Sequence, residues 1–410
     1  MRQRAVVGGV LCRNLLGLLI GWVGCGHGAE WNGVDVLFPS GDLVFAGLFP
    51  YFSAKHLESA EAFFMAVSEI NNDTSVLPNI TITADWKNAL CSGAVGARES
   101  VGQYLTWGEK MVAIIGPACS SASASVATVT STLYSMPQLS HASTSPSLNN
   151  PAEYPHFSRA IASDSFAAKV MADVTAAYGW NRIALLYSND EYGTNLAAAF
   201  QQNAAERVII TRGFDMYLGV GDGVDDTAEE LASRKAAALD MLENVVVLNS
   251  IKIVAILSSK DTDIQAILSA AIASCTARGV DPAEFVWILG ENAADVPAEL
   301  NATNPGHLII VSPAVGNRYT EFYEKFIRLN ETCPLCDLTP HRYDSNGDID
   351  VYFYAPFAYD ATWAMAFALD NMTKVGLDPF DGDALQLALR SVVFEGVTGE
   401  FVLDADGERE

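Results

Sequence analysis

The segment IIGPACSSASASVATVT, residues 114–130, predicts the end of a buried strand, a turn and the start of a helix. In open parallel α/β sheets, ligands bind beyond the carboxyl ends of the strands, where the N–H groups that open a helix are unpaired and partly positive. Ser120 and Ser121 would add hydroxyl donors to those amides. The segment therefore predicts a carboxylate site without lysine or arginine, although a helix N-cap role for either serine is an equal alternative.

The strand-then-helix pattern continues along the chain. Short, nearly continuous apolar runs alternate with helix-length patterns, which predicts parallel sheets with helices on both faces. Because 410 residues are too many for one such sheet, we expect an α/β fold of two doubly wound lobes. The predicted strands are 42–49, 80–86, 111–117, 136–140, 157–161, 182–188, near 207–214, 252–259 and 285–290, and the predicted helices include 57–71, 93–105, 166–179, 225–245 and 262–279.

A second hydroxyl cluster, SHASTSPS at 140–147, follows the next predicted strand. Adjacent strands of a parallel sheet end at the same edge, so the two clusters are expected to face one pocket. The alternative for Thr144 and Ser145 is ordinary turn chemistry before Pro146.

The composition restricts the function classes. Acidic residues outnumber basic ones 49 to 24, and a net charge of −25 argues against nucleic-acid binding. Residues 1–29 have the features of a secretory signal, because arginines precede a short apolar run at 15–24 and small residues follow it. That run is too short to span a bilayer, although an uncleaved anchor is the alternative. We therefore expect a secreted chain or one at the extracellular face of the plasma membrane.

Cysteines and glycosylation sequences fit export. Five cysteines follow the signal, so at least one has no partner within the chain. Five Asn-x-Ser/Thr sequences are candidate glycosylation sites. Their asparagines are Asn72, Asn79, Asn301, Asn330 and Asn371.

Seven segments in order carry a family resemblance: EAFFMAVSEINND, AIIGPACSSASA, PQLSHASTSPSL, FSRAIASD, WNRIALLYSNDEYG, YAPFAYDATWAMAFALDNM and FEGVTGEFVLDADGE. From about residue 42 to its end, the chain resembles the extracellular ligand-binding region of class C G-protein-coupled receptors and natriuretic-peptide receptors. These regions have the bilobed periplasmic-binding-protein type I, or Venus-flytrap, fold. The resemblance is nearest to metabotropic GABA-B receptors, followed by metabotropic glutamate receptors.

The resemblance implies a domain layout. The first lobe would comprise residues 36–163 and 305–392, and the second lobe residues 164–304. Residues 393–410 would return to the second lobe and stop one strand short of the family pattern, which suggests a receptor fragment or a truncated product.

The resemblance also implies site residues. Ser120 matches the serine that binds a ligand carboxylate, and Thr144 matches a second contact of the first lobe. Asp164 and Glu291 match acids that receive an ammonium, and Tyr192 matches the aromatic residue that covers the ligand. GABA-B-like sites carry an aromatic residue where Glu291 stands, which puts GABA itself in doubt. No basic residue is evident for a distal carboxylate, so we expect a neutral amino-acid-like ligand.

Cys91 and Cys119 match a disulfide of the resembling receptors, which would fix the serine loop. Cys333 and Cys336 lack a second pair at metal-site spacing, so a local disulfide or a link to Cys275 is expected there. The sequence DSNGDID at 344–350 lacks two calcium-loop positions and predicts a solvated acidic turn.

Enzyme and cofactor motifs are not evident, so we expect no catalysis, cofactor or metal. Ser120, His141 and Asp164 occur in order, but no G-x-S-x-G elbow accompanies them. A free secreted or periplasmic-type amino-acid-binding protein and the ectodomain of a receptor guanylate cyclase are the alternatives to a class C receptor. The resemblance implies hinge closure on a ligand and dimerisation, as a homo- or heterodimer, through the first lobe.

Overall fold

A computed structural model describes residues 41–51, 54–207, 209–216, 251–259, 261–293, 306–328 and 351–409, with isolated positions 232, 233, 236 and 242. All of these residues belong to one compact unit that spans residues 37–410. In these ranges, no helix carries an apolar stretch long enough to cross a membrane. The helix expected at 225–245 lies almost entirely outside the described residues.

The first sheet has five parallel strands in the order β2-β1-β3-β4-β5. β1 lies between β2 and β3, with Leu43 opposite Ile82 and Val44 opposite Met111. A reversal of strand order of this kind creates a ligand-binding crevice beyond the carboxyl ends of the strands. The strands are β1 (Leu43–Phe49), β2 (Ile82–Asn88), β3 (Met111–Ile115), β4 (Gln138–Ser140) and β5 (Phe157–Arg159).

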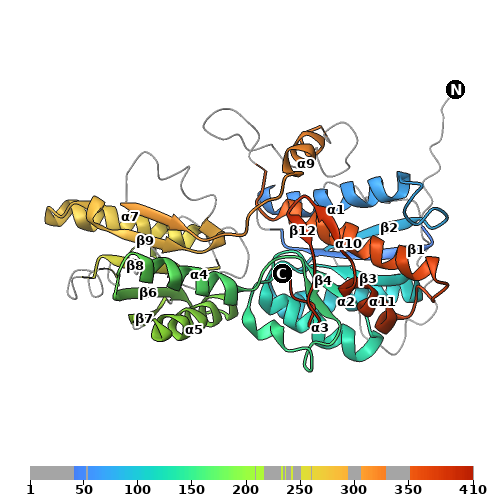
Figure 1. Cartoon of the computed structure of the whole chain (residues 1–410), viewed down its shortest axis with the longest axis horizontal. Helices are drawn as coiled ribbons and strands as arrows, with labels where there is room; N and C mark the ends of the chain where they lie inside the picture. Colours follow the sequence, from blue (N-terminus) through green and yellow to red (C-terminus); the bar gives the residue numbers. More distant parts are fainter. Residues whose placement is uncertain are drawn as a thin grey trace, which may run out of the picture. The chain divides into compact units, whose positions relative to one another are not determined.

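Helices cover both faces of this sheet (Figure 1). Because side chains alternate along β1, Leu48 joins a core cluster with Val126 of α3, whereas Phe49 packs against Phe63 of α1 with ring centroids 5.5 Å apart. The sequence 57–71 places apolar side chains at helical spacing on one face, and these are buried in the structure, which confirms the predicted helix. They are Ala60, Phe63, Phe64, Val67 and Ile70. The helices are α1 (Ala54–Asn72), α2 (Gly93–Trp107), α3 (Ser120–Tyr134), α10 (Ala355–Lys374) and α11 (Gly382–Arg390), with 3-10 turns η1 (Gly108–Lys110) and η2 (Pro146–Asn149).

The second sheet repeats this connectivity in the order β7-β6-β8-β9-β10, again with all strands parallel. One face packs against α4 and α5, where Ile183 contacts the cluster around Phe200, and the other face packs against α7 through Trp287 and Ile267. The elements are β6 (Arg182–Ser188), β7 (Ile210–Met216), β8 (Ile253–Leu257), β9 (Val286–Leu289), β10 (His307–Ile310), α4 (Asp164–Ala177), α5 (Glu191–Glu206), α7 (Asp261–Arg278), η4 (Pro282–Glu284) and η5 (Glu291–Ala293).

Two expected boundaries need correction. The short apolar run of β10 pairs in parallel with β9 and so extends the second sheet. The second lobe, expected to end at residue 304, therefore includes β10. The segment 393–410 does not return to the second lobe. Its hairpin, β11 (Phe394–Gly396) and β12 (Gly399–Phe401), is a separate two-stranded sheet that contacts α10, since Asp360 accepts hydrogen bonds from the amides of Val397 and Thr398. The helix α9 (Tyr319–Phe326) lies between β10 and α10 in the chain.

Candidate functional site

The expected site residues all follow the carboxyl ends of parallel strands. Ser120 follows β3, Thr144 follows β4 and Asp164 follows β5 in the first sheet. Tyr192 follows β6 and Glu291 follows β9 in the second sheet. This is the edge at which parallel α/β sheets bind ligands.

Ser120 is the first residue of α3, and the N-cap is Cys119, so neither serine of the pair caps the helix. The Ser120 hydroxyl is buried and accepts a hydrogen bond from the amide of Ser145 at 3.2 Å. Gly116 has a φ of 99°, which favours glycine, and a side chain there would meet the Leu48 carbonyl. The turn thus brings the start of α3 beside the loop after β4.

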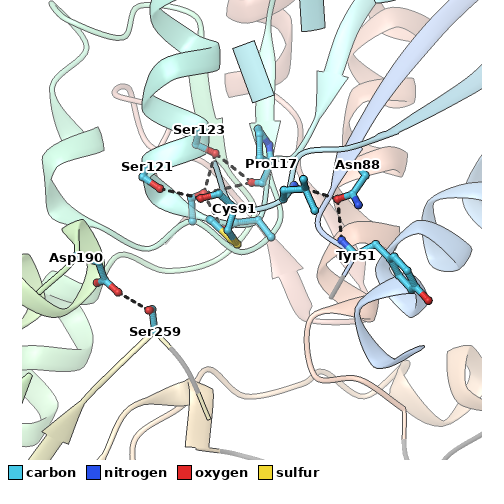
Figure 2. The surroundings of a disulfide bond; sticks show 12 residues. Tyr51, Asn88, Cys91, Pro117, Ser121, Ser123, Asp190 and Ser259 are labelled. Atoms are coloured by element: carbon cyan, nitrogen blue, oxygen red, sulfur yellow. Dashed lines mark hydrogen bonds between the residues drawn. A yellow bond between two sulfur atoms is a disulfide. The ribbon is translucent and has the colours of Figure 1, made fainter. Parts of the chain in front are cut away.

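The expected disulfide between Cys91 and Cys119 is present, with 5.1 Å between its Cα atoms. It ties the residue before α3 to the loop after β2, where the exposed Ser121 hydroxyl donates to the Cys91 carbonyl at 3.4 Å (Figure 2). Ser121 therefore contacts this loop, whereas Ser120 contacts the loop after β4.

Several other serines of the two hydroxyl clusters are structural. Ser123 donates a hydrogen bond to the Pro117 carbonyl at 3.1 Å (Figure 2). Ser140 donates to the same carbonyl at 2.6 Å, and Ser143 donates to the Ala118 carbonyl at 3.0 Å. Ser145 caps η2 before Pro146, as its turn interpretation predicts. Hydroxyls therefore satisfy buried carbonyls of the turn after β3.

The acidic residues of the two sheets meet at Thr144. Its hydroxyl donates to Oε1 of Glu291 at 3.4 Å, and its carbonyl accepts from the amide of Asp164 at 2.8 Å. Asp164 is 1 % exposed and Glu291 is 3 % exposed. The structure thus brings two buried carboxyl groups together.

Neither carboxyl oxygen of Asp164 has a hydrogen bond of normal geometry. Burial raises the pKa of Asp164 well above its ordinary value, and the charge of Glu291 raises this pKa further, while the nearby Thr144 hydroxyl and Arg159 lower it. Burial also raises the pKa of Glu291, while the Glu291 backbone amide and the hydroxyls of Tyr192 and Thr144 lower it. The pair therefore has a strong affinity for a proton or another cation.

Tyr192 combines packing with proximity to these acids. Its ring belongs to the core cluster of the second sheet, and a side chain at Gly290 would come within 2.8 Å of its hydroxyl. Burial raises the pKa of Tyr192 well above its ordinary value, and Glu291, Asp164 and Tyr354 raise it further. The phenol thus lies beside the acidic pair as a neutral group.

His141 is buried, but it is not hydrogen-bonded to Ser120. Its two ring nitrogens have no partner, and its ring packs against Phe49 with centroids 4.9 Å apart. Burial lowers the pKa of His141 to about 3. Ser120 and His141 therefore do not form the hydrogen-bonded pair of a Ser–His–Asp triad.

The remaining candidates from the sequence are the metal, cysteine and glycosylation positions, and only some of them lie in the described residues. In the described ranges, no group of three or more His, Cys, Asp or Glu residues could hold a metal ion. Cys275 is a buried free cysteine. Cys333 and Cys336 lie outside the described residues, as do 344–350, Asn301 and Asn330, so the expected pairing of these two cysteines stays a prediction. The other candidate glycosylation sites, Asn72, Asn79 and Asn371, are exposed.

Sequence reasoning missed Arg159. Its side chain is fully buried, and its guanidinium donates to the carbonyls of Ser143 and Ser145, on either side of Thr144, at 3.1 Å each. The available signal was a lone charge at 159 inside the apolar run of a predicted strand, because such a charge needs buried partners.

Comparison with known proteins gives relatives over most of the chain. It is 24% identical over 382 residues to metabotropic glutamate receptor-like protein E of Dictyostelium discoideum, covering 90% of this chain and 41% of that protein. It is 25% identical over 433 residues to metabotropic glutamate receptor 4 of Macaca fascicularis, covering 88% and 45%. A shorter match, 30% over 200 residues, covers 40% of this chain and 22% of human metabotropic glutamate receptor 8.

The chain spans less than half the length of these relatives, two of which are named as receptors and one as a receptor-like protein. A nearer resemblance to GABA-B receptors stays a prediction. The family described as the receptor family ligand binding region matches residues 58–410, and the fold has the paired parallel sheets expected for it. The chain therefore belongs to the receptor family ligand binding region.

Proposed function

We propose that this chain binds a small amino-acid-like zwitterion at the meeting point of its two sheets. The observation that carries the proposal is the buried carboxyl group of Asp164, whose oxygens lack hydrogen bonds of normal geometry, beside Glu291. The cation whose charge acts on Asp164 is Arg159, and that cation is paired with Glu408. A ligand ammonium would supply both the positive charge and the donors that this pair needs.

The carboxylate of the ligand would bind at the start of α3. The first amides of a helix have no partner within the helix and attract anions. Ser120 places its hydroxyl at this end, and Thr144 lies on the neighbouring loop. The two ends of the ligand would thus contact different groups, with neutral donors for the carboxylate and acids for the ammonium.

The side chain of the ligand would be neutral. A buried apolar cluster includes Ala142, the residue directly before Ser143. Its other members include Ile161, Tyr354 and Phe357. Tyr354 in this cluster also acts electrostatically on Tyr192, which supports a position of the cluster near the ligand. An apolar wall of this kind favours an uncharged ligand side chain.

In the whole protein, ligand binding would shift an open–closed equilibrium of the two halves and so act as an extracellular signal input of a class C receptor. The contact between Thr144 and Glu291 supports this proposal, because it joins a loop of the first sheet to a loop of the second. Dimerisation through the half that contains the first sheet would transmit the shift. The exposed asparagines 72, 79 and 371 support an extracellular location, which a mobility shift on deglycosylation would test.

Calorimetric titration of the purified chain with each of the twenty L-amino acids and with GABA tests the proposed ligand class. We expect heat from at least one neutral amino acid and none from the same titration of the Asp164→Asn variant. An absence of heat from every compound with the unmodified chain would contradict the proposal.

A further inference from the structure

Arg159, the last residue of β5, is a fully buried cation whose hydrogen bonds reach two distant parts of the chain. Its Nε donates to Glu408 at 2.8 Å, one terminal nitrogen donates to the carbonyls of Ser143 and Ser145, and the other donates to the Asn149 amide oxygen. A buried guanidinium is stable only when it is paired in this way. These partners therefore determine where it lies.

The carbonyls that Arg159 holds flank Thr144. Because the C=O and N–H of a trans peptide point in opposite directions, fixing the Ser143 carbonyl directs the Thr144 N–H away from Arg159. The adjoining atoms contact the site as well, since the Ser145 amide donates to Ser120 and the Thr144 carbonyl accepts from Asp164. Arg159 thus fixes the loop that joins three residues of the proposed site.

On its other side, the Arg159 guanidinium contacts the segment 404–409. Glu408 forms the ion pair with Arg159 at 2.7 Å, and the Gly407 carbonyl accepts from the Arg159 amide at 3.1 Å. Asp404 holds Glu408 in place, because its carboxylate accepts from the Glu408 amide at 2.9 Å. The segment 404–409 and the loop 143–145 therefore share one guanidinium.

We propose that Arg159 is a positioning residue for ligand binding, and that its ion pair with Glu408 couples the segment 404–409 to the ligand-binding loop 143–145. This inference rests on the proposed function. Glu408 neutralises a charge that acts on Asp164. Without Glu408, the buried guanidinium would compete with the ammonium of the ligand for Asp164 and would hold the loop less firmly. By linkage, a bound ligand stabilises the attachment of 404–409 by the same factor.

The test compares Glu408→Gln with Asp406→Asn. The control removes the same charge from an exposed residue of the same segment. Without ligand, we expect amide hydrogen exchange of residues 141–149 to speed up at least several-fold in Glu408→Gln and to stay unchanged in Asp406→Asn. Equal exchange of this loop in the unmodified chain and both variants would overturn the proposal. If Glu408→Gln does not fold, Glu408→Asp, which shortens the reach to Arg159, replaces it with the same expectation.

A second measurement separates positioning from a merely structural role. In calorimetric titration with each of the twenty L-amino acids and GABA, we expect the dissociation constant of the binding compound to rise roughly tenfold in Glu408→Gln. In the unmodified chain that compound should also slow hydrogen exchange at 403–409, and unchanged exchange there would contradict the coupling. If no compound binds the unmodified chain, the proposed function fails, while exchange of 141–149 still decides whether Arg159 and Glu408 hold the loop.

Discussion

The Thr144 hydroxyl donates a hydrogen bond to Glu291 at 3.4 Å, and this contact joins a loop of the first sheet to a loop of the second. Asp164 donates its amide to the carbonyl of the same threonine. One residue thus contacts both acids of the proposed site. A ligand ammonium bound between these acids would strengthen the link between the two sheets, because it would interact with a carboxylate from each.

The two adjacent serines at the start of α3 should differ in their effect on binding. Ser120→Ala removes a buried hydroxyl that faces the loop of Ser145, so we expect the affinity for the amino-acid ligand to fall about tenfold or more. Ser121→Ala removes an exposed hydroxyl that contacts the Cys91 carbonyl, so we expect little change. Titration calorimetry on both variants checks this, and equal losses would argue against a carboxylate site at Ser120.

Replacing the buried acid should improve stability while it removes binding. Asp164→Asn eliminates a charge that lacks hydrogen bonds of normal geometry, so we expect the free energy of unfolding of the unliganded chain to rise by about 1 kcal/mol. The same change should abolish detectable ligand binding, because the ammonium loses its carboxylate. Chemical denaturation and calorimetry measure the two effects. A variant that is less stable and still binds would refute this role.

Stability and affinity should change with pH in opposite directions. The pKa values of Asp164 and Glu291 are raised in the folded state, so protonation stabilises the fold. This contribution is fully present below about pH 4, where both carboxyl groups are also protonated in the unfolded chain, and is lost as the pH rises through the raised values. Binding of an ammonium needs ionised acids, so affinity should rise with pH over the same window.

Thermal unfolding and calorimetry between about pH 5 and about pH 8 check this pH dependence. The groups that face the pair from neighbouring elements are Tyr192, which burial keeps neutral in this range, and Arg159, whose guanidinium is paired with Glu408. In Asp164→Asn, we expect the dependence of stability on pH to become weaker. An affinity that falls as the pH rises would be inconsistent with ammonium recognition by this pair.

The disulfide should support both stability and the site. Replacing Cys91 and Cys119 by alanine releases a loop closed across a sequence separation of 28, so we expect the free energy of unfolding to fall by about 3 kcal/mol. Ligand affinity should fall as well, because the bond anchors the residue before Ser120. Cys275→Ala, in the core of the second sheet, is the control and should leave affinity unchanged. Urea denaturation and calorimetry measure both, and unchanged affinity in the double variant would show that the bond does not position Ser120.

Much of the fold could be predicted because its signals are local. The apolar runs at 111–117 and 182–188 and the amphipathic pattern at 57–71 each reflect burial against a neighbouring element, and each became the element expected. The extent of the second sheet was harder to predict, because the short run at 307–310 becomes a strand only through its pairing with β9. The return of 393–410 was placed wrongly because its position depends on buried polar contacts with Asp360 and Arg159.

The site was predictable in its residue types, but its contacts were not. Hydroxyls after two adjacent strands indicate a shared edge, which correctly brings Ser120 beside the loop of Thr144. The meeting of Thr144 with Glu291 joins residues 147 positions apart, and no local pattern encodes it. Arg159 was missed for a similar reason, because its partner Glu408 is 249 positions away.

A crystal structure of the chain with the amino acid that binds most tightly tests the central claim most directly. We predict that the ligand nitrogen lies within hydrogen-bond distance of the carboxylates of Asp164 and Glu291, and that the ligand carboxylate contacts the Ser120 hydroxyl and the first amides of α3. A ligand bound elsewhere, or one bound in the reverse orientation with its carboxylate toward Asp164, would contradict the account.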